Sequence, residues 1–269
     1  MHPTNTHPTI NIAIKAARQA GKIIMRSQDQ LASLAIVEKG IHDFASQVDR
    51  MAEEAIIDTI HKAFPHHAIL GEESGLIAST SGSDTTWIID PLDGTTNFLH
   101  GFPQFCISIA VKKEDKIIHG VVYDPIRDEL FTASRGNGAQ MNGRRLRVSN
   151  ADRLEKSLLG TGFPFREFHN LDNYLTFFRA LIPHCHGIRR AGAAALDLAY
   201  VAAGRLDGFW EFGLKPWDVA AGALFIFEAG GWVTTIDGNP DFLEANSILA
   251  ASPKIHQLML ELYQKHFIA

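Results

Sequence analysis

The stretch that decides the fold is residues 87–97, Trp87-Ile88-Ile89-Asp90-Pro91-Leu92-Asp93-Gly94-Thr95-Thr96-Asn97. Its first three residues are apolar and β-favouring, which predicts a short buried strand. Pro91 cannot donate a ladder hydrogen bond, so we expect the strand to end at Asp90. Gly94 permits a tight bend, and the Thr-Thr-Asn that follows favours the start of a helix. The stretch therefore predicts a strand, a turn and a helix, with Asp90 and Asp93 at the carboxyl edge of the strand.

Two carboxylates three residues apart repel each other unless a cation lies between them. Hard oxygen ligands beside the start of a helix suit Mg²⁺ together with a phosphate group, because backbone N–H groups and hydroxyls hold phosphate oxygens. A solvated surface turn is the alternative, since Asp-Pro and Asp-Gly are ordinary turn dipeptides. The apolar approach and the Gly-Thr-Thr-Asn exit favour the metal interpretation.

Two further motifs flank the central stretch. Gly71-Glu72-Glu73-Ser74 precedes it, and Pro216-Trp217-Asp218-Val219-Ala220-Ala221-Gly222 follows it. With these three motifs in this order, the chain resembles the inositol monophosphatase family over nearly its whole length, and most of all the bacterial inositol-1-monophosphatase branch. The resemblance implies a mixed α+β and α/β fold, a layered α-β-α-β-α sandwich of the inositol monophosphatase and fructose-1,6-bisphosphatase type.

The resemblance also implies an activity. It implies a Mg²⁺-dependent phosphomonoesterase that hydrolyses myo-inositol monophosphate to inositol and phosphate by attack of metal-activated water, with no phospho-enzyme intermediate. The implied cofactor is Mg²⁺, two or three ions, and the implied inhibitor is Li⁺. The implied metal ligands are Glu72, Asp90, the carbonyl of Leu92, Asp93 and Asp218.

The remaining site residues come from the same resemblance. The implied catalytic group consists of Thr95, Asp49 and Glu72: Asp49 orients Thr95, which helps to position or deprotonate the attacking water, and Glu72 also serves a weaker third metal site through water. The implied substrate is a small phosphorylated polyol. The residues implied to bind it are Asp93, Gly94, Thr95, Ala194 and Glu211.

Two of these acids have simpler interpretations. Asp49 and Asp218 each suit the first turn of a helix, where the helix dipole favours a negative charge. The resemblance instead places Asp49, in the spacing Asp43-x5-Asp49, beside the metal site, and turns Lys39 toward the same cavity. It makes Asp218 the carboxylate that the second half of the chain delivers to the shared site.

Composition describes an ordinary globular chain. The 269 residues are 46% hydrophobic and 20% charged, with a net charge of −5 and no long basic block. We expect no nucleic-acid partner, because the Arg144–Arg147 cluster is short and suits a solvated hairpin edge. Cys106 and Cys185 are expected to be free thiols. Without a signal-peptide pattern or an apolar run of about 20 residues, we expect no membrane association and a cytoplasmic location.

The pattern of predicted elements changes midway. Residues 1–150 read as two helices, separated by a loop at 39–43, followed by a meander of strands, and they carry most of the metal ligands. Residues 151–269 alternate strands and helices and carry Asp218 and the substrate-side residues. The resemblance adds a homodimer, since members of this family are commonly dimers.

Two alternatives remain open at this stage. The same chemistry could act on fructose 1,6-bisphosphate, histidinol phosphate or a 3′-phosphoadenosine nucleotide. The chain could also have an added regulatory role in which its surface binds another protein.

Overall fold

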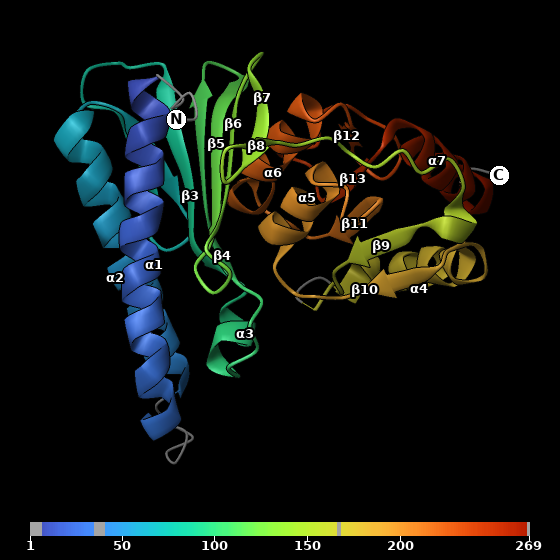
Figure 1. Cartoon of the computed structure of the whole chain (residues 1–269), viewed down its shortest axis with the longest axis horizontal. Coiled ribbons are helices and arrows are strands. Elements are labelled where there is room, and N and C mark those ends of the chain that lie inside the picture. Colours follow the sequence, from blue (N-terminus) through green and yellow to red (C-terminus); the bar gives the residue numbers. More distant parts are fainter. Residues whose placement is uncertain (1–6, 35–40, 166–167, 268–269) are drawn as a thin grey trace.

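Two β-sheets and three helical layers make up the fold in a computed structural model that describes residues 7–34, 41–165 and 168–267 (Figure 1). Within these ranges it describes all side chains except those of residues 29, 31–34 and 41–46. Lys39 therefore lies outside the described residues, and so does the side chain of Asp43.

The first sheet has eight strands in the order β2-β1-β3-β4-β5-β6-β7-β8. Their bounds are β1 Ala68–Gly71, β2 Gly75–Ile77, β3 Thr85–Asp93, β4 Cys106–Lys113, β5 Lys116–Asp124, β6 Glu129–Ser134, β7 Gly138–Met141 and β8 Arg144–Arg145. Only β1 and β3 pair in parallel, and from β3 to β8 every neighbour is antiparallel. The predicted meander is confirmed.

Helices α1 (Pro8–Leu34) and α2 (Ile41–Ala63) cover one face of this sheet. Their apolar stripes pack with the inward residues of β3, β4 and β5 in one buried cluster. The prediction of a loop at 39–43 is wrong at its C-terminal end, since α2 already begins at Ile41.

The second sheet has the strand order β10-β9-β11-β13-β12. Its strands are β9 Leu158–Thr161, β10 Gly187–Arg189, β11 Gly208–Phe212, β12 Trp232–Thr234 and β13 Ser247–Ala251. Helices α5 (Ala194–Ala202) and α6 (Pro216–Glu228) lie between the two sheets, and α4 (Leu171–Leu181) and α7 (Pro253–Phe267) cover the outer face of the second sheet. The predicted α-β-α-β-α sandwich is confirmed.

Small residues hold the middle layer together. Alanines and Gly222 fill the interface where α5 and α6 cross, in a cluster that includes residues of both sheets. A Cβ atom added at Gly222 would lie 2.4 Å from the Cβ of Leu198 on α5. On the other side of α6, a Cβ at Gly120 of β5 would lie 3.2 Å from the Cα of Ala221. Because α6 is packed this closely on both sides, its first turn is held in a fixed position over the first sheet.

We also find no helix in the described ranges that is long and apolar enough to cross a bilayer.

The close packing of α6 gives a stability prediction. Helix propensity alone would make Gly222→Ala stabilising by up to about 1 kcal/mol. We expect the opposite, a loss of about 1–3 kcal/mol in the free energy of unfolding, because the added methyl group meets Leu198 in a filled interface. Urea denaturation measures the difference, and a variant more stable than the parent chain would contradict the packing described for α5 and α6.

Candidate active site

A β-bulge in β3 shapes the central stretch. Asp90 pairs with Ser108 of β4 and Asp93 pairs with Cys106, so three steps along β3 match two along β4. The strand thus continues to Asp93, and the expectation that it ends at Asp90 is wrong. Pro91, which has no N–H group to donate, falls in the bulge, where no ladder bond is needed. The Oδ1 atom of Asp90 accepts a hydrogen bond from the backbone N–H of Leu92 at 2.9 Å, which bends the chain there.

Gly94 turns the chain from β3 into the short helix α3 (Thr95–Leu99). It has φ 96° and ψ 33°, in the left-handed region that favours glycine. A Cβ atom there would lie 2.8 Å from the carbonyl oxygen of Gln104. The hydroxyl of Thr95 donates back to the carbonyl of Leu92 at 3.0 Å. The turn therefore brings the Leu92 carbonyl and the Thr95 hydroxyl together beside the two aspartates.

Glu72 reaches the same edge from β1. Its backbone N–H donates to the carbonyl of Ile89 at 3.1 Å, which places Glu72 beside the end of β3. Glu53 of α2, which is buried, accepts a hydrogen bond from the N–H of Glu73 at 3.2 Å and so fixes the turn after β1. A side chain at Gly71 would collide with the Glu53 carboxylate as it is placed, so glycine here leaves room for Glu53 beside the turn.

Asp218 reaches the edge from the second half of the chain. Ser108, the cross-strand partner of Asp90, donates from its hydroxyl to the carbonyl of Trp217 at 3.1 Å. This bond ties the first turn of α6 to the strand that carries Asp90. Asp218 also caps the helix, since its Oδ2 atom accepts from the N–H of Lys215 at 2.6 Å. One serine thus couples the positions of two predicted metal ligands that are far apart in sequence.

A second link joins the central stretch to α5. The Oδ2 atom of Asp93 accepts a hydrogen bond from the N–H of Ala195 at 2.7 Å, so the start of α5, with Ala194, lies against this carboxylate. The side-chain amide of Asn97 donates to the carbonyls of Gln104 at 2.7 Å and Ala191 at 2.9 Å. These bonds hold the loop before α5 next to α3.

The four acids lie close enough for their charges to affect one another. Burial raises the pKa of Asp90, which is 1% exposed, well above its ordinary value, and the charges of Glu72, Asp93 and Asp218 raise it further. Burial likewise raises the pKa of Asp93, with the charge of Asp218 as the next cause. No ion pair joins Asp90 or Asp93 to a basic side chain within the described ranges. The repulsion between these two carboxylates is therefore not offset by any basic side chain in the described part of the chain.

The donor set fits Mg²⁺. Every side chain at this edge offers carboxylate oxygen, and the Leu92 carbonyl adds another hard donor, which is the set that Mg²⁺ prefers. As the side chains are placed, however, no three His, Cys, Asp or Glu groups among the described residues converge closely enough to hold a metal ion. Backbone N–H groups occupy oxygens of Asp90, Asp93 and Asp218 instead. A cation would have to draw these carboxylates together.

The expected pair of Asp49 and Thr95 is not made in this structure. Thr95 donates to Leu92, and the buried Oδ1 atom of Asp49 has no hydrogen-bond partner. Burial first, then the charges of Glu73 and Glu72, raise the pKa of Asp49 to about 8. The structure shows no hydrogen bond between Asp49 and Thr95, so the orienting role of Asp49 stays a prediction.

Glu211 lies on β11 at the predicted substrate side. Its carboxylate lies directly against Gly162, where a side chain would collide with it. Burial raises its pKa well above the ordinary value, the charge of Asp218 raises it further, and Arg190 lowers it. Glu211 is therefore close enough to Asp218 to sense its charge, as the sequence predicts, while remaining partly open to solvent.

Sequence reasoning missed four residues that shape this site: Glu53, Asn97, Ser108 and Asp197. Asp197 of α5 is buried, and its burial raises its pKa to about 8. Ser108 and Asn97 act through contacts with residues about 100 positions away, which no local pattern reveals. Glu53 could have been found from the sequence, because it is an acid on the border of an apolar helix stripe.

Comparisons with known proteins all lead to one family. The model of the inositol monophosphatase family matches residues 5–267. "Nus factor SuhB" of Pseudomonas aeruginosa is 55% identical over 262 residues, which cover 96% of this chain and 97% of that protein. "Nus factor SuhB" of Escherichia coli K12 is 48% identical over 94% of this chain and 95% of its own length.

Among solved structures, inositol monophosphatase from Anabaena (Nostoc) sp. PCC 7120 superposes with a TM-score of 0.86 at 40% identity, covering 98% of both chains. The motif order, the layered fold and these matches lead to one conclusion: the chain belongs to the inositol monophosphatase family.

Proposed function

We propose that this protein is a Mg²⁺-dependent phosphomonoesterase that hydrolyses myo-inositol monophosphate. The observation that carries the proposal is that buried Asp90 senses the charges of Glu72, Asp93 and Asp218, acids from three separate segments whose repulsion a bound cation would offset. The family supports a phosphatase, and the name of the Anabaena relative supports inositol monophosphate as the substrate.

In this proposal different sets of acids bind different metal ions. Glu72, Asp90 and the Leu92 carbonyl would hold one ion, Asp90, Asp93 and Asp218 would hold a second, and Glu72 would also serve a weaker third site. The bound ions would supply a water of lowered pKa and stabilise the charge that develops on the phosphate. Gly94 and the start of α3 present backbone N–H groups to the phosphate oxygens. Thr95, oriented by Asp49 once cations reduce the surrounding repulsion, positions the attacking water.

The leaving group is proposed to bind between Glu211, Asp93 and the backbone at Ala194. Carboxylate oxygens there accept hydrogen bonds from hydroxyl groups of a polyol ring. Phe163 and Phe165, which Arg190 covers at 5.5 and 5.1 Å from the ring centres, follow Gly162 and flank this side of the site. A fructose, histidinol or adenosine phosphate would meet the same metals but different partners on this side.

Replacing Asp90 tests the metal assignment. We expect Asp90→Asn to abolish turnover, because the amide cannot bridge two cations, while the fold stays intact. Without metal the variant should melt at a higher temperature than the parent chain, because it removes one of the mutually repelling charges. The difference should grow as pH rises above the ordinary aspartate pKa of about 4. A folded-state pKa above the unfolded value makes the metal-free parent less stable as pH rises.

Phosphate release with saturating Mg²⁺ and thermal unfolding in EDTA measure the two effects. A well-folded variant with parental activity would contradict the assignment.

The same proposal includes inhibition by Li⁺, which would enter the second site without supplying a divalent charge. Its test is phosphate release with increasing LiCl against a KCl control.

A second substitution separates recognition from chemistry. We expect Glu211→Ala to lower kcat/KM for inositol monophosphate. The activation free energy should rise by about 1–3 kcal/mol, the cost of an unmade charged hydrogen bond. Activity on p-nitrophenyl phosphate, which has no ring hydroxyls, should change much less. The control is Glu261→Ala, an exposed acid on α7, which should change neither. Equal losses on both substrates would move Glu211 into the catalytic group.

The names of the relatives support a second role. Because relatives 55% and 48% identical to this chain are called Nus factors, we propose that the chain also binds the transcription machinery. This role matches the regulatory alternative drawn from sequence and requires the predicted cytoplasmic location. Asp90→Asn should then co-purify RNA polymerase as well as the parent chain does. Absence of RNA polymerase from both preparations would count against the role.

We further propose a homodimer. Exposed apolar side chains gather around α4 and the loop before it: Phe163, Phe165, Phe168, Leu171, Leu175 and Ile182. A patch of this kind marks an interaction surface more often than a solvated face. Sedimentation of the full chain at micromolar concentration tests the dimer, and a single monomeric species would contradict it.

A further inference from the structure

Strand β4 brings two polar side chains to the candidate active site from the face of the first sheet that α5 and α6 cover. One is Ser108, whose hydroxyl donates to the carbonyl of Trp217. The other is Cys106, a free thiol as the sequence predicts, which lies two residues earlier and therefore points to the same face. Cys106 is completely buried and pairs with Asp93 in the register of β3 and β4. The thiol thus lies beside a carboxylate of the second predicted metal position.

The thiol of Cys106 donates a hydrogen bond to Asp93. Its Sγ atom lies 3.7 Å from Oδ2, the same oxygen that accepts from the N–H of Ala195 at 2.7 Å. Burial raises the pKa of the Cys106 thiol well above its ordinary value, and the charge of Asp93 raises it further, so the sulfur keeps the proton that it donates. No hydrogen bond joins Oδ1 of Asp93 to another described residue. Asp93 is therefore held through one oxygen and offers the other to a ligand.

Two donors on Oδ2 prepare Asp93 for a cation in two ways. They fix the orientation of the carboxylate, so less side-chain freedom is lost when a metal ion binds Oδ1. They also stabilise the ionised form of the carboxyl group, which is the form that binds a metal ion. Neither donor carries a charge that would repel the cation.

A packing role is the alternative for Cys106. Its side chain is also part of the apolar cluster between the first sheet and helices α5 and α6, and a buried cysteine can act as a small hydrophobic residue. The two roles differ in what they require of the side chain. Packing depends on size alone, whereas orientation of Asp93 depends on a hydrogen-bond donor, so alanine and serine at position 106 separate them.

We propose that Cys106 is a positioning residue whose thiol holds Oδ2 of Asp93, so that Oδ1 faces the second divalent cation. This inference rests on the proposed metal-dependent phosphatase function and adds a residue to it. Cys106 itself binds neither the cation nor the substrate. It sets the affinity of the second metal position, and with it the Mg²⁺ concentration at which the enzyme works.

Infrared spectroscopy of the S–H stretch tests the hydrogen bond directly. The chain has two cysteines, so Cys185→Ala, between α4 and β10, leaves Cys106 as the only thiol. We expect the Cys106 band to shift when saturating MgCl₂ is added to the metal-free protein, because the charge on the accepting carboxylate changes. KCl at equal ionic strength should leave the band in place. A band that MgCl₂ does not move would overturn the proposal.

Calorimetric titration of the metal-free chain with MgCl₂ measures the effect on affinity. Cys106→Ala should weaken Mg²⁺ binding about two- to fivefold, the loss expected for one weak hydrogen bond. Cys106→Ser restores a donor and should bind Mg²⁺ more tightly than Cys106→Ala does. Parental affinity in Cys106→Ala, or equal losses in the alanine and serine variants, would overturn the proposal.

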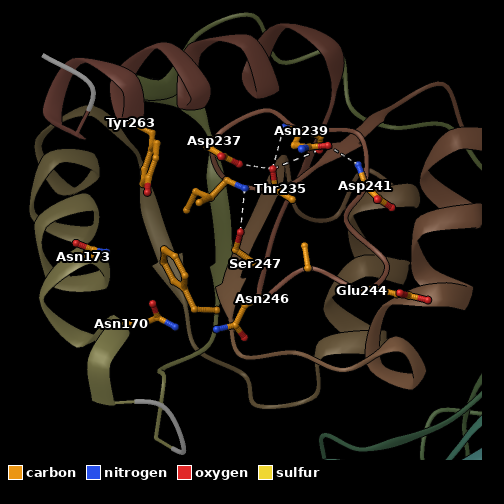
Figure 2. A pocket seen from close by; sticks show the side chains of 13 residues that line it. Asn170, Asn173, Thr235, Asp237, Asn239, Asp241, Glu244, Asn246, Ser247 and Tyr263 are labelled. Carbon is orange, nitrogen blue, oxygen red and sulfur yellow. Dashed lines mark hydrogen bonds between the residues drawn. The ribbon is translucent and has the colours of Figure 1, made fainter.

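An acid outside the active site supplies the matched control. Asp237 lines a pocket of about 550 Å³ between α4, α7 and the segment 235–247 (Figure 2). Its carboxylate accepts a hydrogen bond from the hydroxyl of Thr235, and Figure 2 shows the Glu244 carboxylate well apart from it and pointing away. Asp237→Asn removes one negative charge and should change neither the Mg²⁺ affinity nor the S–H band. A loss as large as that of Cys106→Ala would place the measured binding elsewhere and overturn the proposal.

Enzyme kinetics separate this inference from the proposed function. Cys106→Ala should need more Mg²⁺ for half-maximal phosphate release, while kcat at saturating Mg²⁺ and KM for inositol monophosphate stay parental. An active parent chain whose Mg²⁺ dependence is unchanged in Cys106→Ala would overturn the role of Cys106 and leave the phosphatase function standing. A parent chain that neither binds Mg²⁺ nor releases phosphate would overturn both.

Discussion

Repulsion between Asp90 and Asp93, two buried carboxylates at the end of one strand, is the constraint on which the rest of the site depends. Burial alone disfavours their ionised forms, and each also senses the charge of Asp218. Among the residues that the structure describes, neutral donors, the N–H groups of Leu92 and Ala195, bond to these carboxylates and no basic side chain does. Such an arrangement stores unfavourable electrostatic energy that a divalent cation can release.

The fold places these acids near one another because it brings distant segments to one edge of the first sheet. Ser108 binds the backbone beside Asp218 while pairing with Asp90, and Asn97 fixes the loop before α5. The close approach of α6 to both α5 and β5, through Gly222 and Gly120, lets the helix that carries Asp218 lie against the first sheet. Packing of small residues in the middle layer and the electrostatics of the site are therefore parts of one arrangement.

The sequence predicted what depends on local pattern. The strand-turn-helix at 87–97, the meander marked by Asn-Gly turns and the alternation of the second half all follow from periodicity and turn chemistry. The α-β-α-β-α order of the layers was predicted from the resemblance to the inositol monophosphatase family. The bulge at Pro91 was missed because the proline was treated as a strand end, although a bulge also removes the need for its N–H group. The link through Ser108 could not be predicted, since it depends on a contact across 109 residues.

Proton release on binding of Mg²⁺ tests the central claim most directly. Metal-free protein should hold protons on Asp90 and Asp93 at pH values at which exposed aspartates are ionised, since burial and mutual repulsion raise the pKa values of both carboxyls. A cation that binds these carboxylates must displace those protons. Calorimetric titration with MgCl₂ in two buffers of different ionisation enthalpy measures the number released. The account predicts binding with net proton release that falls as pH rises. Binding without proton release, or no binding at millimolar Mg²⁺, would contradict it.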